Sequence, residues 1–513
     1  MNQKIKIAFI HPDLGIGGAE RLVVDAAVGL QERGFEVTIY TSHCDRSHCF
    51  EEIKSNSLKV VVYGDFLPTN LAGKFFILFS NLRQLNLTTQ MVLKGEVGVH
   101  DVFIVDQLST CVPLLQIFGR MKTRVMFYCH FPDQLLAKRQ GWVKKLYRVP
   151  FDLLEQVTMA FADSIVVNSG FTKSVFRKTF TFLQSEPEVV YPCVSLDPVT
   201  IPLQDQSILQ ELRLAENKFY LSINRFERKK NIELALKAFA ESQAPGNRFK
   251  LVLAGGYDYR IDENREYLRE LENIVKQSGL FSATIHFSKD VTPLKSDIAL
   301  QLKSADIIFL TSVSSSFKEL LLQKMELLLY TPSYEHFGIV PLEAMKAGKP
   351  VLAVSNGGPL ETVVSLKPGQ NDEEATGWLR PPIVEEWAAV LNQSKDILKP
   401  KTTIFHTNGP LRVKERFSRE AMTHSFEENI QECSSWRYYK ARKQIFQVMR
   451  GFIAFLLISC LTFLPKIYAF LSFFSIIFLL EREAYLINEL HTHIVNFNKT
   501  LQSHLWSILN NVV

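Results

Sequence analysis

The strongest constraint on the fold is a repeated alternation of short apolar runs, loops and amphipathic segments. The chain opens with KIKIAFI (residues 4–10), which has the length and alternation of a strand. A glycine loop, PDLGIGGAE, and a helical pattern that ends at Gly34 follow, and EVTIYT (36–41) repeats the strand pattern. A strand, a loop, a helix and a strand in this order indicate a parallel α/β sheet.

The same rhythm occurs again in the second half of the chain. VSLDPVTIPLQDQ (194–206) has little regular pattern and reads as a linker. On either side of it, further strands are predicted in DVFIVDQ, RVMFYCHFP, DSIVVNS, KFYLSINRF, FKLVLAGG, ATIHFS, ADIIFLTS and VLAVS. We therefore predict two tandem α/β domains that face each other with the carboxyl ends of their strands, where open parallel sheets bind ligands.

Length, charge and cysteine content narrow the class of protein. A chain of 513 residues is too long for one compact core. The net charge of +5 comes without a basic block interleaved with aromatics, which argues against a nucleic-acid partner. Seven scattered cysteines indicate reduced thiols in the cytosol. HCDRSHC (43–49) lacks a second pair of ligands at zinc spacing, so a loop is favoured over a metal site.

The C-terminal tail has a different character. Residues 451–464 and 467–480 are uninterrupted apolar stretches separated by Pro465 and Lys466. Each is shorter than the ~20 residues that a membrane-spanning helix needs. We favour a membrane-embedded hairpin or a pair of interfacial segments, with a soluble helix pair as the alternative. Basic residues between 440 and 450 place the first end on the cytosolic side.

Two apolar runs outside the tail have two possible interpretations. FFILF (75–79) and ELLLQKMELLLY (319–330) could each be a core helix or a further membrane contact, and the core helix is favoured.

The stretch YEHFGIVPLEA (334–344) carries the clearest chemical signal. Pro341 suits the first position of a helix that ends at Gly348, so the backbone N–H groups just before it form an anion site. Glu343, in the first turn, could cap the helix or accept hydrogen bonds from a ribose diol. Glu335 would lie on the other side of the anion, beside the group that a phosphate carries. Together these features indicate a nucleotide-sugar site.

Two cations follow the first strand of the second domain. Arg225 and Lys230 in SINRFERKKN could neutralise a departing diphosphate, or form a solvated basic turn. In LGIGGAE, Glu20 stands where a dinucleotide fingerprint needs its third glycine, and no acid ends the second strand. A nicotinamide site is therefore disfavoured, while a loop that admits phosphate or sugar is favoured. His130, at a strand end, could be structural or could contact substrate.

These motifs resemble a known family. The pair Glu335-x7-Glu343, GGAER near the N-terminus and Arg225-x4-Lys230 are together similar to the retaining family 4 glycosyltransferases of the GT-B fold, over residues 1–435. YCHFPDQLLA, SINRFERKKNIELAL and the apolar tail resemble, more narrowly, the dolichol-pathway α-1,3/1,6-mannosyltransferases.

The resemblance implies a reaction and an organisation. It implies transfer of mannose from GDP-mannose to a dolichol-diphosphate-linked Man-GlcNAc2 acceptor, with retention, at the cytosolic face of the endoplasmic reticulum, during assembly of the N-glycan precursor. No cofactor or metal is expected, and membrane lipid and other enzymes of the same pathway are the expected partners. The implied parts are an acceptor-side domain (1–200), a nucleotide-sugar domain (201–412), a crossover region (413–440) and a membrane-associated tail (441–513).

The resemblance also implies roles for single residues. Arg225 and Lys230 would hold the diphosphate, Glu343 the ribose, and Glu335 the transferred mannose. His130 would touch the sugar near the reacting carbon. Backbone groups would complete the site: those of Gly338, Ile339 and Val340 at the diphosphate, of Gly17 and Gly18 at the donor–acceptor junction, and of Gly255 and Gly256 near the base. The last helix (412–431) would cross back to the first domain.

Two alternatives stay open. One is a GT-B transferase that uses another nucleotide sugar on a different glycolipid, because the motifs do not distinguish guanine from uracil. The other is a non-catalytic membrane scaffold, against which the four charges at positions 225, 230, 335 and 343 argue. Asn86 and Asn392 begin glycosylation sequons, and with cytosolic catalytic domains we expect neither to carry glycan.

Overall fold

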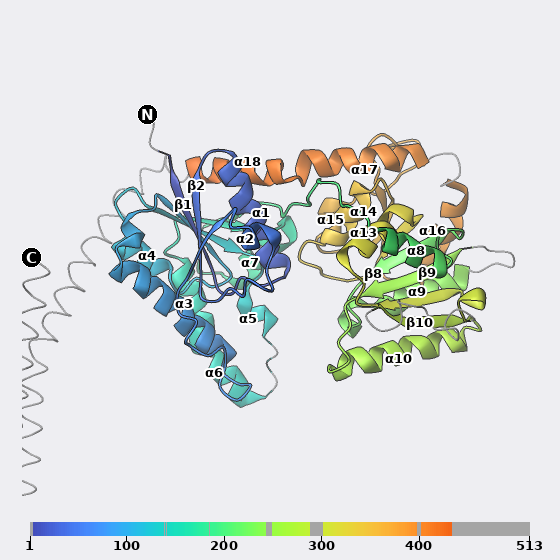
Figure 1. Ribbon diagram of the computed structural model, residues 1–513, viewed down its shortest axis with the longest axis horizontal. Helices are drawn as coiled ribbons and strands as arrows, with labels where there is room; N and C mark the ends of the chain where they lie inside the picture. The colour runs from blue at the N-terminus through green and yellow to red at the C-terminus, as the bar shows by residue number, and fades with distance from the viewer. Residues whose placement is uncertain are drawn as a thin grey trace, which may run out of the picture. The chain divides into compact units, whose positions relative to one another are not determined.

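The computed structural model describes residues 4–432, except 138, 140, 184, 243–248, 288–300 and 398–401. This part of the chain contains two parallel sheets of seven strands each, with helices on the faces of both (Figure 1). The predicted α/β class with two Rossmann-like sheets is confirmed. The predicted tail and the end of the crossover region lie outside the described residues.

The first sheet is built from the N-terminal half of the chain. In spatial order its strands are β3 (Lys59–Val62), β2 (Glu36–Thr41), β1 (Lys6–His11), β4 (Val102–Asp106), β5 (Arg124–Cys129), β6 (Ser164–Val167) and β7 (Glu188–Val189). Helices connect them: α1 (Gly18–Glu32), α2 (Glu51–Lys54), α3 (Phe76–Leu93), the short η1 (Glu96–Gly98), α4 (Val112–Phe118), α5 (Asp133–Leu136), α6 (Trp142–Met159) and α7 (Gly170–Thr179).

The second sheet follows the same plan. Its strands in spatial order are β10 (Ser282–His286), β11 (Ile307–Thr311), β9 (Lys250–Gly255), β8 (Phe219–Ile223), β12 (Leu327–Tyr330), β13 (Val351–Val354) and β14 (Gly377–Arg380). Its helices are α8 (Leu203–Glu211), η2 (Arg228–Lys230), α9 (Ile232–Ser242), α10 (Asp262–Gln277), α13 (Ser315–Lys324), α14 (Ile339–Lys346), α15 (Pro359–Thr362), α16 (Val384–Ile397) and α17 (Thr402–Arg416). The last described helix, α18 (Arg419–Glu432), packs on the first sheet's part instead.

Each sheet reverses its order at a central strand. In the first sheet the chain extends from β1 towards β2 on one side and towards β4 on the other; in the second, β9 and β12 flank β8 in the same way. In open α/β sheets such a switch point is where ligands bind, outside the carboxyl ends of the strands. The topology therefore selects the loops after β1, β4, β8 and β12 as candidate site elements.

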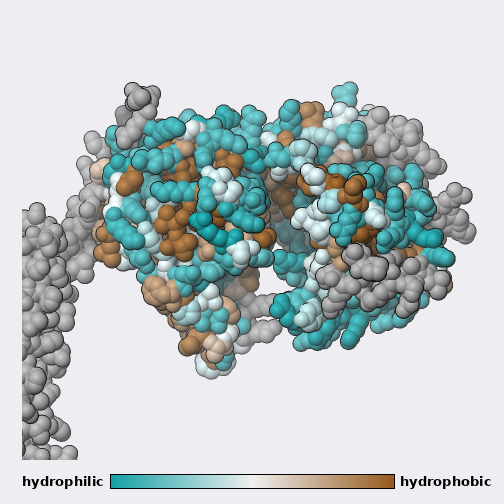
Figure 2. Space-filling model, in the orientation of Figure 1, coloured by the Kyte–Doolittle hydropathy of each residue, from teal (hydrophilic) through white to brown (hydrophobic). Residues whose placement is uncertain are grey.

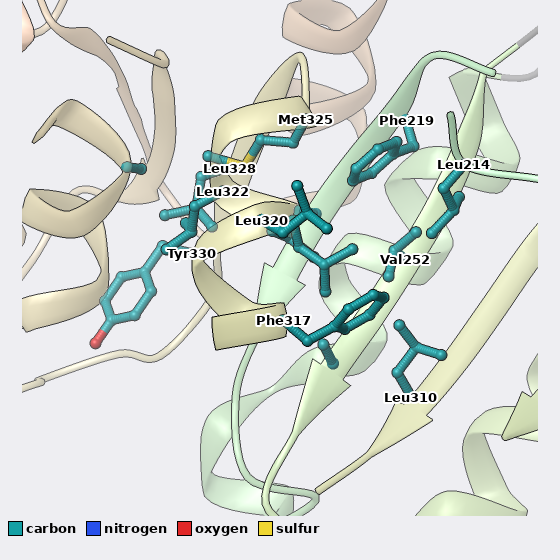
Figure 3. Packing of buried hydrophobic residues seen from close by; sticks show 14 of the residues in the cluster. Leu214, Phe219, Val252, Leu310, Phe317, Leu320, Leu322, Met325, Leu328 and Tyr330 are labelled. Atoms are coloured by element: carbon teal, nitrogen blue, oxygen red, sulfur yellow. The ribbon is translucent and has the colours of Figure 1, made fainter. Parts of the chain in front are cut away.

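Apolar cores fill both faces of both sheets. The inner strands are buried almost continuously because helices cover each side, whereas the edge strands β3 and β7 are partly exposed. Figure 3 shows one of these clusters, in which Phe317 and Leu320 of α13 pack against Phe219 of β8 and Val252 of β9. A core of this kind holds the strand ends rigidly, which is what a site built from strand-end loops requires.

Three predicted boundaries differ from the structure. The first helix begins at Gly18 rather than at Arg21, so Glu20 lies in its first turn, where its charge favours the positive helix end. The linker is shorter than predicted because Leu203 begins α8. ELLLQKMELLLY is not one helix: α13 ends at Lys324 and the rest forms β12. Periodicity alone cannot separate short buried helices from buried strands.

The chain crosses back to the first sheet, as predicted, but through two helices. α17 packs on α14, and α18 packs on α1 (Figure 1). Ser418 divides the predicted single helix, because its hydroxyl accepts the N–H of Ala421 and its carbonyl accepts that of Met422. Three residues of α18 complete the core around β1: Met422, Phe426 and Ile430.

The two apolar runs with open interpretations have different outcomes. In ELLLQKMELLLY the leucines are buried, so their place in the core is confirmed, whereas a helix is wrong for Leu327–Tyr330, which form β12. In FFILF, Phe75 and Phe76 are 44% and 55% exposed, so the core interpretation is wrong for these two residues. Among the described residues, no helix is both long and apolar enough to cross a membrane.

Candidate active site

The carboxyl edge of the first sheet holds a chain of buried charged groups. Asp106 ends β4 and lies between two histidines: its Oδ2 is 2.7 Å from Nδ1 of His11, and its Oδ1 is 2.6 Å from Nε2 of His130. His11 ends β1, and its Nε2 is 3.7 Å from the Glu20 carboxylate. Because β1 and β4 are paired strands at the switch point, their last residues meet directly.

Burial and mutual attraction shift the ionisation of this network. Burial opposes the charge on His11, but the carboxylates of Asp106 and Glu20 outweigh it and raise the pKa of His11 to about 9. Burial likewise opposes the charge on Asp106, but both histidines lower its pKa to about 2. The Asp106 carboxylate is thus ionised at neutral pH and fixes His130, whose side chain is 21% exposed. His130 and Glu20 are therefore the two groups of this network that a ligand can reach, because His11 and Asp106 are buried.

The carboxyl edge of the second sheet holds a charged pair that is open to solvent. Nζ of Lys230, at the end of η2, is 2.6 Å from Oε2 of Glu335, and the two side chains are 20% and 25% exposed. The Lys230 carbonyl also accepts the hydroxyl of Thr331, the residue after β12. The loops after β8 and β12, the switch-point strands, are therefore joined, and two of the predicted site residues are in direct contact.

Helix α14 begins at Ile339, four residues after Glu335. Gly338 is its N-cap, with φ of 85°, a conformation that glycine adopts without strain. A side chain there would press on the ring of Tyr330, 3.2 Å away. Ile339 and Val340 are the first helical residues, so Pro341 is third and not first as predicted. The N–H groups at the start of this helix remain available to an anion.

Glu343 differs from its predicted position. It lies in the second turn of α14 and pairs with Lys318 of α13, with 2.7 Å between Oε1 and Nζ. Its other oxygen, Oε2, is buried and has no hydrogen-bond partner among the described residues. Burial and the charges of Glu335 and Glu343 together raise the pKa of Tyr330, the last residue of β12.

Arg225 and Gly255 lie on neighbouring loops. The Arg225 side chain is exposed just beyond β8, and no ion pair to it occurs within the described part of the chain. Gly255 ends β9 against the backbone of Asn224, where any side chain would clash. The predicted glycine therefore has a structural reason as well: it lets the loop that carries Arg225 lie close to β9. The next glycine, Gly256, accepts the N–H of Phe226 in the same loop.

Gly17 and Gly18 lie at the start of α1. A side chain at Gly17 would collide with the Glu20 carboxylate, whereas one at Gly18 would meet nothing within 4 Å. Gly17 thus gives Glu20 the space to turn towards His11. Their predicted place at a donor–acceptor junction stays a prediction.

The two edges are joined through His336. Its ring stacks on Phe131, the residue after His130, with centroids 3.7 Å apart. Its carbonyl accepts the hydroxyl of Ser169 at 2.5 Å. Burial, together with the positive charge of Lys230, lowers the pKa of His336. His130 from the first sheet and the Lys230–Glu335 pair from the second therefore lie around one histidine.

A second connection involves Glu361 of α15. Its carboxylate accepts the N–H groups of Gly170 and Phe171, both at 2.7 Å, and the hydroxyl of Tyr191 at 3.0 Å. Glu361, which follows β13 of the second sheet, thereby caps the N-terminus of α7, a helix of the first sheet.

Comparisons with known proteins show the family of the chain. The family model described as Glycosyltransferase Family 4 matches residues 16–198, and that described as Glycosyl transferases group 1 matches residues 204–399. A curated relative from Saccharomyces cerevisiae, "Alpha-1,3/1,6-mannosyltransferase ALG2", is 57% identical over 431 residues, or 83% of this chain and 85% of the relative. The relative of the same name from Candida glabrata is 58% identical over 83% of this chain and 93% of its own length.

The chain belongs to the ALG2 family of alpha-1,3/1,6-mannosyltransferases. The predicted family 4 glycosyltransferase class and its mannosyltransferase branch are confirmed. A more distant ALG2 relative, from Schizosaccharomyces pombe, is 47% identical over 88% of this chain and 85% of its own length.

Solved structures confirm the fold of this ALG2 family member. Sucrose-phosphate synthase from Thermosynechococcus elongatus gives a TM-score of 0.57 at 20% identity, over 84% of this chain and 99% of the other. A glycosyltransferase from Rickettsia africae gives 0.60 at 14% identity, over 84% and 99%. At these identities the likeness concerns the two-sheet architecture alone.

Sequence reasoning missed several residues that lie at the two carboxyl edges. Asp106 and His11 were detectable as polar residues at strand ends, in DVFIVD and KIAFIH. Lys318 and His336 carried no such signal, because only the packing of α13 and the Phe131 contact reveal their places. Within the described residues, no group of three or more metal-ligating side chains converges, and His43 of the HCDRSHC stretch contacts Asp65 at 2.7 Å.

Proposed function

We propose that the chain transfers mannose from GDP-mannose to a dolichol-diphosphate-linked Man-GlcNAc2 acceptor, forming α-1,3 and α-1,6 linkages with retention. The supporting observation is the contact between Lys230 and Glu335 at the start of α14, beside His130 of the other sheet. The names of the relatives support the linkages.

The pairing of Lys230 with Glu335 suggests how the donor would bind. The diphosphate enters next to Lys230, Arg225 and the first N–H groups of α14, and Lys230 exchanges Glu335 for phosphate oxygens. The freed Glu335 carboxylate accepts hydroxyl groups of the mannose. The unpartnered Oε2 of Glu343 accepts the ribose hydroxyls.

The transfer replaces one bond to the anomeric carbon by another. The bond between this carbon and the phosphate oxygen breaks, and the acceptor hydroxyl forms a new bond on the same face. Its proton passes to the departing phosphate oxygen, and GDP leaves. Lys230, Arg225 and the α14 N-terminus stabilise the negative charge that develops on the diphosphate, and no metal or other cofactor is needed for this step.

His130 would orient the sugar from the other side. Asp106 fixes its Nε2, so the remaining imidazole surface is presented in one orientation. We propose that this surface contacts the mannose near the reacting carbon, and that Gly17 and Gly18 border the path of the acceptor.

The setting follows from the acceptor. A lipid-linked acceptor requires the enzyme to work at a membrane. We propose the endoplasmic reticulum membrane, with the catalytic part in the cytosol together with other enzymes of the pathway. Asn392 is exposed, so a glycan on it after expression in eukaryotic cells, detected as a glycosidase-sensitive mass shift, would contradict this orientation.

The test is an assay with the purified full chain. It is incubated with GDP-mannose or UDP-glucose and the lipid-linked Man-GlcNAc2 acceptor, and products are digested with linkage-specific mannosidases. We expect two mannoses to be added from GDP-mannose, one in each linkage, and nothing from UDP-glucose. Transfer from UDP-glucose would favour the alternative donor, and no transfer from either would favour a scaffold.

A further inference from the structure

Helix α6 presents an apolar face to solvent. Five side chains recur at intervals of three or four residues, which places them on one side of the helix. Their exposed fractions are 76% for Trp142, 66% for Leu146, 47% for Val149, 59% for Leu153 and 56% for Val157. A helix that packs its apolar face into its own domain would show the reverse pattern.

Neighbouring elements extend this face. Phe75 and Phe76, at the start of α3, are 44% and 55% exposed, and the Phe75 ring meets Tyr147 of α6 edge-to-face with centroids 5.7 Å apart. Leu135 and Leu136 of α5, which packs on α6, are 52% and 56% exposed. We call the exposed apolar residues of α6 with these four the α6 surface. Apolar atoms gather over the α6 and α3 helices in the space-filling view (Figure 2).

Basic side chains accompany the α6 surface. Lys74, Lys144 and Lys145 are exposed, and none of them forms an ion pair within the described part of the chain. Two nearby acids are already paired with arginines: Asp133 contacts Arg148 at 2.6 Å, and Asp152 contacts Arg139 at 2.9 Å. The surface therefore combines exposed apolar side chains with uncompensated positive charge.

We infer that the α6 surface docks on an anionic phospholipid bilayer, with its apolar side chains at the headgroup–acyl boundary. Contiguous exposed apolar side chains mark a partner, whereas single ones do not. A protein partner would need to supply its own matching acids, but a membrane supplies both apolar depth and anionic headgroups. Helices that lie in the membrane–water interface typically carry Trp and Leu on the face that enters the bilayer and Lys on the face towards the headgroups.

The α6 surface is coupled to the catalytic edge. Glu155 of α6 accepts the N–H groups of Asp133, at 2.8 Å, and Gln134, at 3.3 Å, on the segment that follows His130. The Arg148–Asp133 contact ties the same segment to α6. Docking would thus hold His130 at a fixed distance from the lipid surface. This last step rests on the proposed function, because it matters only for a lipid-linked acceptor; the docking itself does not.

The test uses hydrogen–deuterium exchange of the full chain, because a local readout separates α6 from any other membrane contact. Vesicles of phosphatidylcholine with phosphatidylserine are compared with phosphatidylcholine alone and with buffer. We expect slower exchange of the amides of residues 142–157, greatest with the anionic vesicles. Unchanged exchange would overturn the inference, and slowing that depends on protein concentration without vesicles would replace the membrane by a second copy of the chain.

A double variant tests the side chains. Leu146→Ser with Leu153→Ser should abolish the slowing and raise the KM for acceptor embedded in vesicles by about tenfold or more, since each leucine loses most of its burial. The KM for a short-chain acceptor dispersed in solution should not change. The matched control is Leu203→Ser with Phe281→Ser. These two apolar residues are 84% and 64% exposed but belong to the part of the chain around the second sheet, away from the α6 surface.

The outcomes separate the two proposals. Protection of α6 without mannose transfer by the unmodified chain would support docking and contradict the proposed function. Transfer with equal KM values for the double variant and the control would contradict docking and leave the proposed function supported.

Discussion

The carboxyl edges of the two sheets share a topology but hold charge in opposite ways. At the first edge, His11 and Asp106 are each 1% exposed and neutralise each other. At the second, Lys230 and Glu335 are 20% and 25% exposed. Buried charges must keep their partners, because an unpaired charge inside a protein is very costly, whereas partly exposed charges can exchange a partner for a ligand. The comparison indicates that the first edge is a fixed support and the second is the edge that changes on binding.

The largest effect is expected from a substitution in the buried charged network at the first edge. Asp106→Asn removes the charge that balances His11, and we expect the free energy of unfolding to fall by about 3–5 kcal/mol, measured by urea denaturation. The control is Glu233→Gln, which breaks an exposed pair with Lys237 and should leave stability nearly unchanged. Equal stability of Asp106→Asn and the control would show that the buried network is not a support.

The next effect concerns the second edge. Lys230→Ala should reduce kcat/KM for mannose transfer by about 10²–10³, because it removes a cation from the developing diphosphate charge. The urea midpoint should shift little. Lys229→Ala, at a neighbouring lysine that is 72% exposed, is the matched control and should retain activity. A variant that unfolds instead of losing activity would contradict the distinction between the edges.

A pH titration sharpens the comparison. The folded-state pKa of His11, about 9, lies above its usual 6.5, so its contribution to stability is fully present below pH 6.5 and is lost as the pH rises to 9. We expect the free energy of unfolding to fall on the order of 1–3 kcal/mol between pH 7 and 9. His11→Gln should be less stable at pH 7 and show a flatter profile. An unchanged slope would contradict the protonated state of His11.

The smallest effect concerns the connection between the edges. Glu361→Gln removes the negative charge at the start of α7 and should cost about 1 kcal/mol of stability. Glu385→Gln is the control, because Glu385 lies in the first turn of its own helix. Thermal unfolding of both variants measures the difference, and equal midpoints would show that Glu361 adds no stabilisation beyond an ordinary first-turn acid.

The sequence predicted the elements with strong periodicity and the contacts that follow from strand order. It predicted both sheets and placed Lys230 and Glu335 at one edge, because both follow strands of the same series. The Asp106–His11 contact joins residues 95 positions apart, and only the pairing of β1 with β4 brings them together. Glu343 was placed one turn too early because Pro341 was taken as the first helical residue instead of Ile339.

Four of the described strands were not predicted: β3, β7, β12 and β14. β7 has only two residues, too few for a period to emerge, and β12 lies in ELLLQKMELLLY, where its leucines continue the run of helix α13. The exposed face of α6 was missed as well, since an amphipathic pattern reads the same whether its apolar side meets a core or something outside the chain.

The return of α18 to the first sheet has a consequence for synthesis on the ribosome. Phe426 lies against Tyr128, with ring centroids 5.9 Å apart, and joins the cluster around β1. The last strand of that sheet ends at Val189, so some 240 residues are translated before this cluster can close. At ~5–20 residues per second, the apolar surface that α18 covers stays exposed on the nascent first sheet for roughly 10–50 s. We expect chaperones to bind this surface during that interval.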